Sequence, residues 1–229
     1  MSFIISGDTH GTLDIGKIIK FFEENEGNFN EDDYLIICGD VGVCGFSGSD
    51  EAKVREVYRN FPVTTLFVDG NHENFEHLNA YEIDYWCGGK VHFIESRLIH
   101  LMRGQVFEFN GARFFTFGGA YSIDRKYRIP GVSWFSEEIP TIEEYNEGWE
   151  NLKRVDFQVD YILSHNGPSE VVAAMGFGEI SDEEVEMRKY LQSVADNTEF
   201  TAWYFGHYHE DVCVEDMFYC LYDELIVID

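Results

Sequence analysis

The chain has 229 residues, 45% of them hydrophobic and 20 of them phenylalanine, which is enough to bury a substantial core as one large α/β unit or two small ones. Its 43 acidic and 16 basic residues give a formal net charge of -27, without the basic stripe typical of proteins that bind duplex nucleic acid. Charge therefore favours small or neutral partners over duplex nucleic acid.

Cysteine usage and the start of the chain bear on location. The five cysteines form an odd set without a CxxC spacing, which disfavours a disulfide framework and a thiolate zinc site. We expect most of them to be buried in a reducing compartment. No apolar run approaches the roughly 18 residues needed to cross a bilayer. The chain also opens on Phe3-Ile4-Ile5 without a basic segment. We therefore expect a cytoplasmic protein that does not enter a membrane.

Short apolar runs that end in polar, glycine-containing turns predict buried strands. In chain order they are 3–5 before SGDTHG, 34–38 before GDVG, 65–68 before DGNHE, 161–163 before SHNGP and 202–205 before GHYHED. Helical patterns over about 13–24 and 51–59 separate the first three, which predicts βαβ units and a parallel sheet. Because ligands bind at the carboxyl ends of such strands, we expect the five polar clusters to converge on one edge.

The middle and the end of the chain predict further strands. Residues 106–109 and 113–117 flank the dipeptide Asn110-Gly111, which is a strong signal for a two-residue hairpin turn. The closing stretch DMFYCLYDELIVID indicates two more strands. A second sheet built from this material would pack against the first, with helices outside.

Two helices are expected in the second half, over 142–154 and 182–194. The second begins with a capping-box pattern, because Glu184 follows Ser181 at a distance of three residues. Neither a linker nor a repeat divides the sequence, so we expect a single domain over 1–229.

Five of the eight histidines fall in the strand-end turns, and the other three, His77, His92 and His100, are expected to be surface or core residues. The turns offer seven oxygen and imidazole donors: Asp8, His10, Asp40, Asn71, His165, His207 and His209. One four-coordinate ion cannot use seven ligands, whereas two ions can if a carboxylate bridges them. This donor mixture favours two divalent transition metal ions, namely Mn, Fe, Zn or Co.

The stretch YFGHYHED leaves more than one geometry open. In an extended segment His207 and His209 point to the same side, about 6.6 Å apart. The spacing alone allows them to chelate one ion or to serve two. Two divalent ions, the carboxylates of Asp8 and Asp40 and one hydroxide would together carry a charge of about +1, which favours a phosphate oxyanion as the ligand.

The ordered motifs GDTH, GD, GNHE, a lone histidine and GHYH resemble the calcineurin-like metallophosphoesterase superfamily. The resemblance implies an α/β fold, a two-sheet β-sandwich flanked by helices in four αββα layers. It also implies that Asp40 bridges two metal ions. The remaining ligands would divide into two sets, one of Asp8, His10 and His209 and the other of Asn71, His165 and His207.

The resemblance further implies a reaction in which a metal-bridging hydroxide attacks phosphorus in line. His72 would be catalytic, protonating the leaving oxygen or stabilising the transition state. Glu73 would support the ligands from behind.

Two features of the sequence, a departure from the superfamily's protein-phosphatase motif and the segment around 118–141, bear on the substrate. Protein phosphatases of this superfamily carry GDxxDRG, whereas this chain reads CGDVGVCGFSG, which disfavours a protein substrate. The segment around 118–141 contains clustered aromatic and basic residues. Either Trp134 and Phe135 pack it as a loop, or it forms a substrate-facing insert in which Tyr121, Arg125 or Arg128 contacts the phosphoester. Arg128 is the stronger candidate of the two arginines, and arginine suits bidentate phosphate binding.

The sequence therefore predicts a hydrolase acting on a small phosphomonoester or phosphodiester, with a small phosphoester or a nucleotide-like compound as the expected partner. A nuclease of the same superfamily and a non-catalytic scaffold are the alternatives. The acidic surface disfavours the nuclease, and the complete donor set together with His72 disfavours the scaffold.

Overall fold

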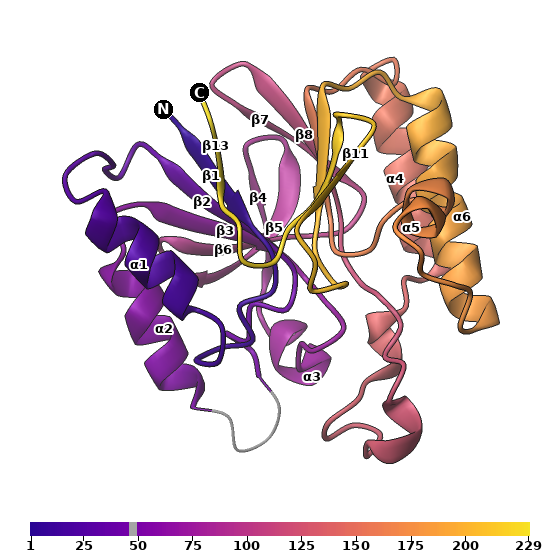
Figure 1. Ribbon diagram of the computed structural model, residues 1–229, viewed down its shortest axis with the longest axis horizontal. Helices are drawn as coiled ribbons and strands as arrows, with labels where there is room; N and C mark the ends of the chain where they lie inside the picture. The colour runs from indigo at the N-terminus through magenta and orange to yellow at the C-terminus, as the bar shows by residue number, and fades with distance from the viewer. Residues whose placement is uncertain (46–49) are drawn as a thin grey trace.

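The computed structural model of the protein describes residues 1–45 and 50–229. Two β-sheets pack face to face, and helices cover the outer face of each (Figure 1). The helices are α1 (Gly16–Glu24), α2 (Glu51–Asn60), α3 (Phe75–Leu78), α4 (Ile142–Arg154), α5 (Ser169–Ala174) and α6 (Asp182–Asn197). With α1 and α2 on one side and α4 to α6 on the other, the layers run αββα, which confirms the predicted fold class.

The two sheets are mixed, each with a parallel centre. The first runs, in spatial order, β13 (Ile226–Ile228), β1 (Phe3–Ser6), β2 (Tyr34–Cys38), β3 (Thr64–Val68), β6 (Leu98–Leu101), β5 (Gly89–Glu95) and β4 (Ile83–Trp86). The second runs β11 (Val212–Val214), β12 (Phe218–Cys220), β10 (Ala202–Phe205), β9 (Tyr161–Ser164), β8 (Ala112–Phe117) and β7 (Gln105–Phe109). Strands β1, β2, β3 and β6 are parallel, and so are β8, β9, β10 and β12.

This topology corrects the expectation of a single converging edge. The five predicted strands are all present, but β1, β2 and β3 belong to the first sheet, whereas β9 and β10 belong to the second. Because the two sheets face each other, the polar turns that follow these strands approach from both sides. The predicted hairpin of β7 and β8 is confirmed, with Phe109 opposite Ala112.

Three apolar layers hold the four structural layers together. Ile4 packs between the first sheet and its helices, whereas its neighbour Ile5 packs between the two sheets. Trp203 lies in the third layer, under α4 to α6, and its indole donates to Ser164 Oγ at 2.7 Å. Alternate residues of one strand are thus buried on opposite faces, which is why the strands appear in the sequence as continuous apolar runs.

The helix boundaries follow local capping. Ser181 Oγ accepts from the Glu184 N–H at 3.1 Å, which confirms the predicted start of α6. Thr141 and Glu144 form a reciprocal capping box at the start of α4. Among the described residues, none of the helices is both long and apolar enough to span a bilayer. The five cysteines are free, and three of them are buried.

The three histidines outside the strand-end turns occupy surface and core positions, as expected. His77 is exposed and lies 2.9 Å from Glu51. His92 and His100 are buried, with their Nδ1 atoms 3.0 Å apart, and His100 Nε2 lies 3.1 Å from Asp69 Oδ1. Burial lowers the pKa of His92 from 6.5 to about 4.

We expect His92 to make the fold sensitive to acid. Between pH 6.5 and pH 4 the unfolded chain binds a proton at this residue and the folded chain does not, so stability falls as the pH falls. Urea unfolding should show that the free energy of unfolding of the wild type falls between pH 7 and pH 5. In His92→Gln this fall should be smaller by about 2 kcal/mol. An equal loss in both proteins would contradict this assignment.

Candidate metal centre

The predicted ligands and His72 lie on the turns that follow five strands. Asp8 and His10 follow β1, Asp40 follows β2, Asn71 and His72 follow β3, His165 follows β9, and His207 and His209 follow β10. Donor atoms within 4.8 Å of one another form three overlapping groups: Asp8, His10 and His209; Asp8, Asp40 and His165; and His10, Asp40 and His72. The first group has the same members as the first predicted ligand set.

Asp40 lies at the centre of these contacts and is buried. Its Oδ2 is 3.4 Å from His10 Nε2 and 3.4 Å from His165 Nε2, and its Oδ1 accepts from the His72 N–H at 2.7 Å. Burial would raise the pKa of this carboxyl, but His165 and the other facing histidines outweigh it and hold the pKa well below its usual range. Asp40 therefore carries its negative charge inside the protein.

Asp8 is the second buried carboxylate. Its Oδ2 accepts from the His207 N–H at 2.8 Å, whereas its Oδ1 is buried and has no hydrogen-bond partner in the described part of the chain. Burial raises the pKa of Asp8 to about 6, with Asp40 adding to the rise. A buried carboxylate oxygen without a donor is costly unless a cation faces it.

Two imidazoles turn a ring nitrogen toward Asp40. His165 Nδ1 lies 2.8 Å from the Cys38 carbonyl and donates to it, so Nε2 faces Asp40 and also Asn71 Oδ1 at 3.1 Å. His10 is held in the same way, because its Nδ1 lies 2.7 Å from Asp14 Oδ2. These contacts fix the ring orientation that a metal-binding histidine requires.

Such convergence of lone pairs is stable only when a proton or a metal ion lies between them. Burial opposes a charge on His10, yet hydrogen bonding to Asp40 raises its pKa to about 9. Asp40 likewise raises the pKa of His165 to about 10 against the effect of burial. The buried donors therefore attract positive charge, and the residues present fit the divalent ions that the resemblance implies.

The stretch after β10 differs from the extended geometry expected for it. His207 and His209 both have left-handed backbone, with φ of 70° and 52°, so the prediction that they point to one side of an extended chain is wrong. The ring of His207 lies 5.1 Å from that of His165, whereas the ring of His209 lies 4.9 Å from that of His10. The two imidazoles thus lie against different partners.

Two glycines allow the turns to approach the carboxylates. A Cβ on Gly70 would lie 2.0 Å from Asp40 Oδ1, and one on Gly206 would lie 2.3 Å from Asp8 Oδ2. Any side chain at these positions would displace a buried carboxylate, which gives the glycines of GNHE and GHYH a steric role.

Glu73 supports the turn that carries Asp40. This buried carboxylate accepts from the Val41 N–H at 2.9 Å and from the Gly42 N–H at 3.4 Å. Burial, followed by the charge of Asp40, raises its pKa to about 8. Glu73 therefore supports Asp40 through the backbone of the turn.

The segment around 118–141 brings Arg128 to the centre. Its guanidinium nitrogens lie 3.0 Å and 3.3 Å from the two ring nitrogens of His72. Arg125 instead pairs with Glu183 at 2.9 Å and lies over the ring of Tyr121. Phe135 is buried, as packing of this segment requires.

Sequence reasoning missed three residues that hold the donors in place. They are Asp14, which orients His10, Ser122, which contacts Asn71, and Glu138, which contacts Ser122. Asp14 lies four residues after His10, a spacing that could have indicated it. Ser122 and Glu138 are 51 and more residues from Asn71, so no local pattern indicates them.

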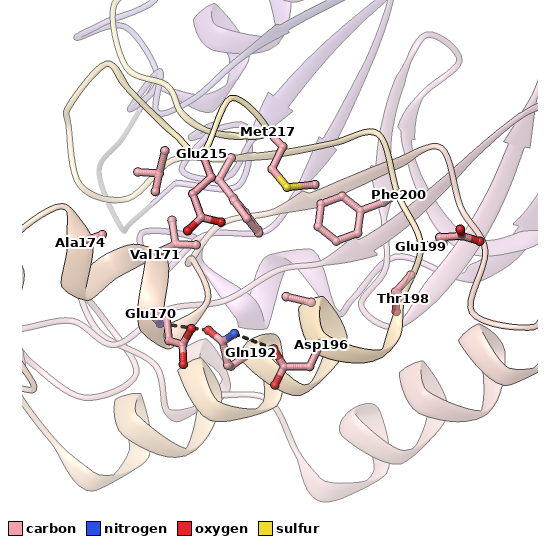
Figure 2. A pocket seen from close by; sticks show the side chains of 13 residues that line it. Glu170, Val171, Ala174, Gln192, Asp196, Thr198, Glu199, Phe200, Glu215 and Met217 are labelled. Carbon is pink, nitrogen blue, oxygen red and sulfur yellow. Dashed lines mark hydrogen bonds between the residues drawn. The ribbon is translucent and has the colours of Figure 1, made fainter.

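A cavity of about 380 Å³ opens beside the donors, lined by His10, Asp40 and His72 and on its apolar side by Leu13 and Val54. Figure 2 shows a second hollow, of about 420 Å³, formed by α5, α6 and the chain around β11 and β12. Its described lining includes none of the predicted site residues. Of these two cavities, the first lies beside the predicted donors.

The family model of the calcineurin-like phosphoesterases matches residues 1–211, and the chain belongs to that family. A lariat debranching enzyme from Arabidopsis thaliana is 25% identical over 222 residues, covering 86% of this chain and 49% of the relative. A Staphylococcus aureus protein assigned as a 5'-nucleotidase, solved with α-ketoglutarate, superposes with a TM-score of 0.54 at 14% identity, covering 100% of this chain and 50% of that one. The chain thus spans about half the length of both, and the second likeness concerns the fold alone.

We expect Mn²⁺ or Zn²⁺ to stabilise the protein against heat and a chelator to reverse the effect. Ion at 100 times its dissociation constant stabilises the folded state by about 2.7 kcal/mol, or roughly 5–10 °C for a chain of this size. Asp8→Asn should lose most of the shift in a thermal melt, because Asp8 Oδ1 would no longer face the ion with a charge. Asp32→Asn, the same change on an exposed aspartate, is the control. Equal shifts in all three proteins would rule out Asp8 as a ligand.

Proposed function

We propose that the protein is a dinuclear, metal-dependent phosphoesterase acting on a small phosphomonoester or phosphodiester. The observation that carries this proposal is the pair of buried carboxylates, Asp8 and Asp40, with imidazole nitrogens directed at them from separate turns. Membership of the calcineurin-like phosphoesterase family supports the reaction class.

The chain's own residues would hold the two ions in two sets that share Asp40. The first set is Asp8, His10 and His209, and the second is Asn71, His165 and His207. When bound, such ions supply Lewis acidity to a phosphoryl group and lower the pKa of a water molecule. Mixed imidazole and carboxylate donors favour Mn, Fe, Zn or Co.

His72 and Arg128 would act on the phosphoester itself. Burial lowers the pKa of His72; the charge of Asp40 opposes this shift and the charge of Arg128 adds to it, with a net lowering that favours a neutral imidazole at pH 7. A neutral ring can donate an N–H hydrogen bond to the leaving oxygen, which supports transition-state stabilisation over full proton transfer as its role. Arg128, whose two terminal guanidinium nitrogens contact this ring, is proposed to contact a phosphoryl oxygen.

The substrate is proposed to be small and nucleotide-like. The net charge of -27 opposes the approach of long polyanions, and a cavity of about 380 Å³ suits a small organic group beside the phosphate. The sequence likeness to a lariat debranching enzyme makes a nuclease acting on branched RNA the second candidate. A scaffold without catalysis is disfavoured by the presence of every predicted donor and of His72.

We expect the protein with Mn²⁺ to hydrolyse p-nitrophenyl phosphate or its bis ester. Asp40→Asn and His72→Ala should each lower kcat by roughly 10²-fold or more, the usual scale for losing a charged or proton-handling group. Asp32→Asn and His77→Ala change exposed residues of the same types and serve as controls. Comparison of nucleoside monophosphates with branched RNA then separates the two candidate substrates. Folded, metal-loaded protein that turns over none of these compounds would favour the scaffold.

Arg128→Lys should raise KM more than it lowers kcat, because an ammonium cannot reproduce bidentate contact with a phosphate. A rise of roughly tenfold is expected. Arg125→Lys is the matched control, since Arg125 contacts Glu183 and Tyr121. A larger effect from Arg125→Lys than from Arg128→Lys would reverse the assignment.

A further inference from the structure

We propose that Glu138 and Ser122 are positioning residues that determine which atom of the Asn71 side chain faces the metal centre. The inference rests on the proposed function in so far as Asn71 is a ligand. An amide has an oxygen that can bind a cation and an NH₂ group that cannot. A site that uses asparagine must therefore fix the amide orientation.

The three side chains form a buried chain of hydrogen bonds. Asn71 Nδ2 donates to Ser122 Oγ at 3.1 Å, and Ser122 Oγ donates to Glu138 Oε2 at 2.6 Å. The other carboxylate oxygen, Glu138 Oε1, accepts from the Ser122 N–H at 2.9 Å. Glu138 is fully buried, and Ser122 and Asn71 are exposed by 2% and 4%. Water therefore has little access to these contacts.

The direction of each bond follows from the carboxylate. A carboxylate only accepts, so the single hydroxyl hydrogen of Ser122 must point to Glu138. The Ser122 oxygen then presents a lone pair to Asn71 and selects its NH₂ group. Asn71 Oδ1 is left facing His165 Nε2 at 3.1 Å, on the side of the metal donors.

The backbone around Glu138 is itself anchored. Arg103 donates to the Glu137 carbonyl at 2.8 Å and, through two nitrogens, to Asp69 Oδ2 at 2.8 Å and 2.6 Å. Asp69 lies two residues before Asn71, so the same arginine ties the segment that carries Glu138 to the turn that carries the ligand. The segment around 118–141 thereby reaches the centre at Asn71 as well as at His72.

Glu138→Gln tests the inference because it reverses the direction of the hydrogen bonds between these side chains while nearly preserving the shape of the side chain. The Ser122 N–H still needs an acceptor, which places the oxygen of the substituted amide there and its NH₂ group against Ser122 Oγ. The hydroxyl hydrogen then turns to Asn71, whose Oδ1 must rotate to accept it. We expect Mn²⁺ affinity, measured by calorimetry or by the electron paramagnetic resonance signal of free Mn²⁺, to fall by about 10- to 100-fold. Glu137→Gln makes the same change on the exposed neighbour and should leave the affinity unaltered.

A rescue separates positioning from simple loss of structure. Asn71→Asp replaces the amide by a group with two equivalent oxygens, one of which can accept from Ser122 while the other binds the ion. The gain in Mn²⁺ affinity from Asn71→Asp should be at least about tenfold larger in the Glu138→Gln background than in the wild type. Equal gains in both backgrounds would overturn the inference.

The amide orientation can also be read without metal or turnover. In the ¹⁵N-correlated spectrum of metal-free protein, the Asn71 side-chain pair is the one absent from the Asn71→Asp variant. We expect it to shift in Glu138→Gln and to stay in place in Glu137→Gln. An unshifted pair in folded Glu138→Gln overturns the inference even if the protein binds metal and is active. A shifted pair in a protein that binds no metal supports the orientation and instead contradicts the proposed function.

Discussion

The burial of two neighbouring carboxylates, Asp8 and Asp40, is the constraint on which the rest of the structure depends. Removing one such charge from water costs several kcal/mol unless opposite charge or hydrogen bonds replace the solvent. The protein supplies backbone N–H groups from the turns after β3 and β10 and imidazoles from turns on both sheets. Facing two sheets toward each other is what allows donors from so many separate strands to reach the same pair of carboxylates.

Several residues around the two carboxylates have left-handed backbone. Besides His207 and His209, the residues Asp8, His10 and Asp40 all have positive φ, between 40° and 52°. Left-handed backbone is uncommon for residues with a Cβ, although aspartate and histidine adopt it more readily than most. Here the turns follow strands that are buried on both faces, so the strands that lead into them are held by core packing. Stability of the sandwich is thus used to hold polar side chains on backbone conformations that are uncommon by themselves.

The sequence could predict the features that local patterns determine, but not those that depend on surroundings in the fold. The five central strands were predictable as apolar runs because each is buried on both faces, and the four longer helices α1, α2, α4 and α6 were predictable from their patterns. The short helices α3 and α5 were not predicted. Strand β4 was not, because it lies at the sheet edge with Ile83 and Tyr85 exposed. The positions of the candidate donors were predictable because these residues follow strand ends directly. The left-handed turn at His207 was not, because positive φ is a minority conformation even for histidine and no local pattern marks this position.

The choice of an amide at position 71 connects these points. Asp8, Asp40 and Glu73 already place three carboxyl groups in the same buried region, and burial together with mutual repulsion raises the pKa of Asp8 and Glu73 to about 6 and 8. A fourth carboxyl there would meet the same repulsion, so a neutral amide is the electrostatically easier group at this position. Neutrality, however, removes the symmetry of the carboxylate, because one end of an amide binds cations and the other repels them. The orientation then has to be imposed from outside the turn, which is what a hydroxyl and a buried carboxylate from a distant segment can do.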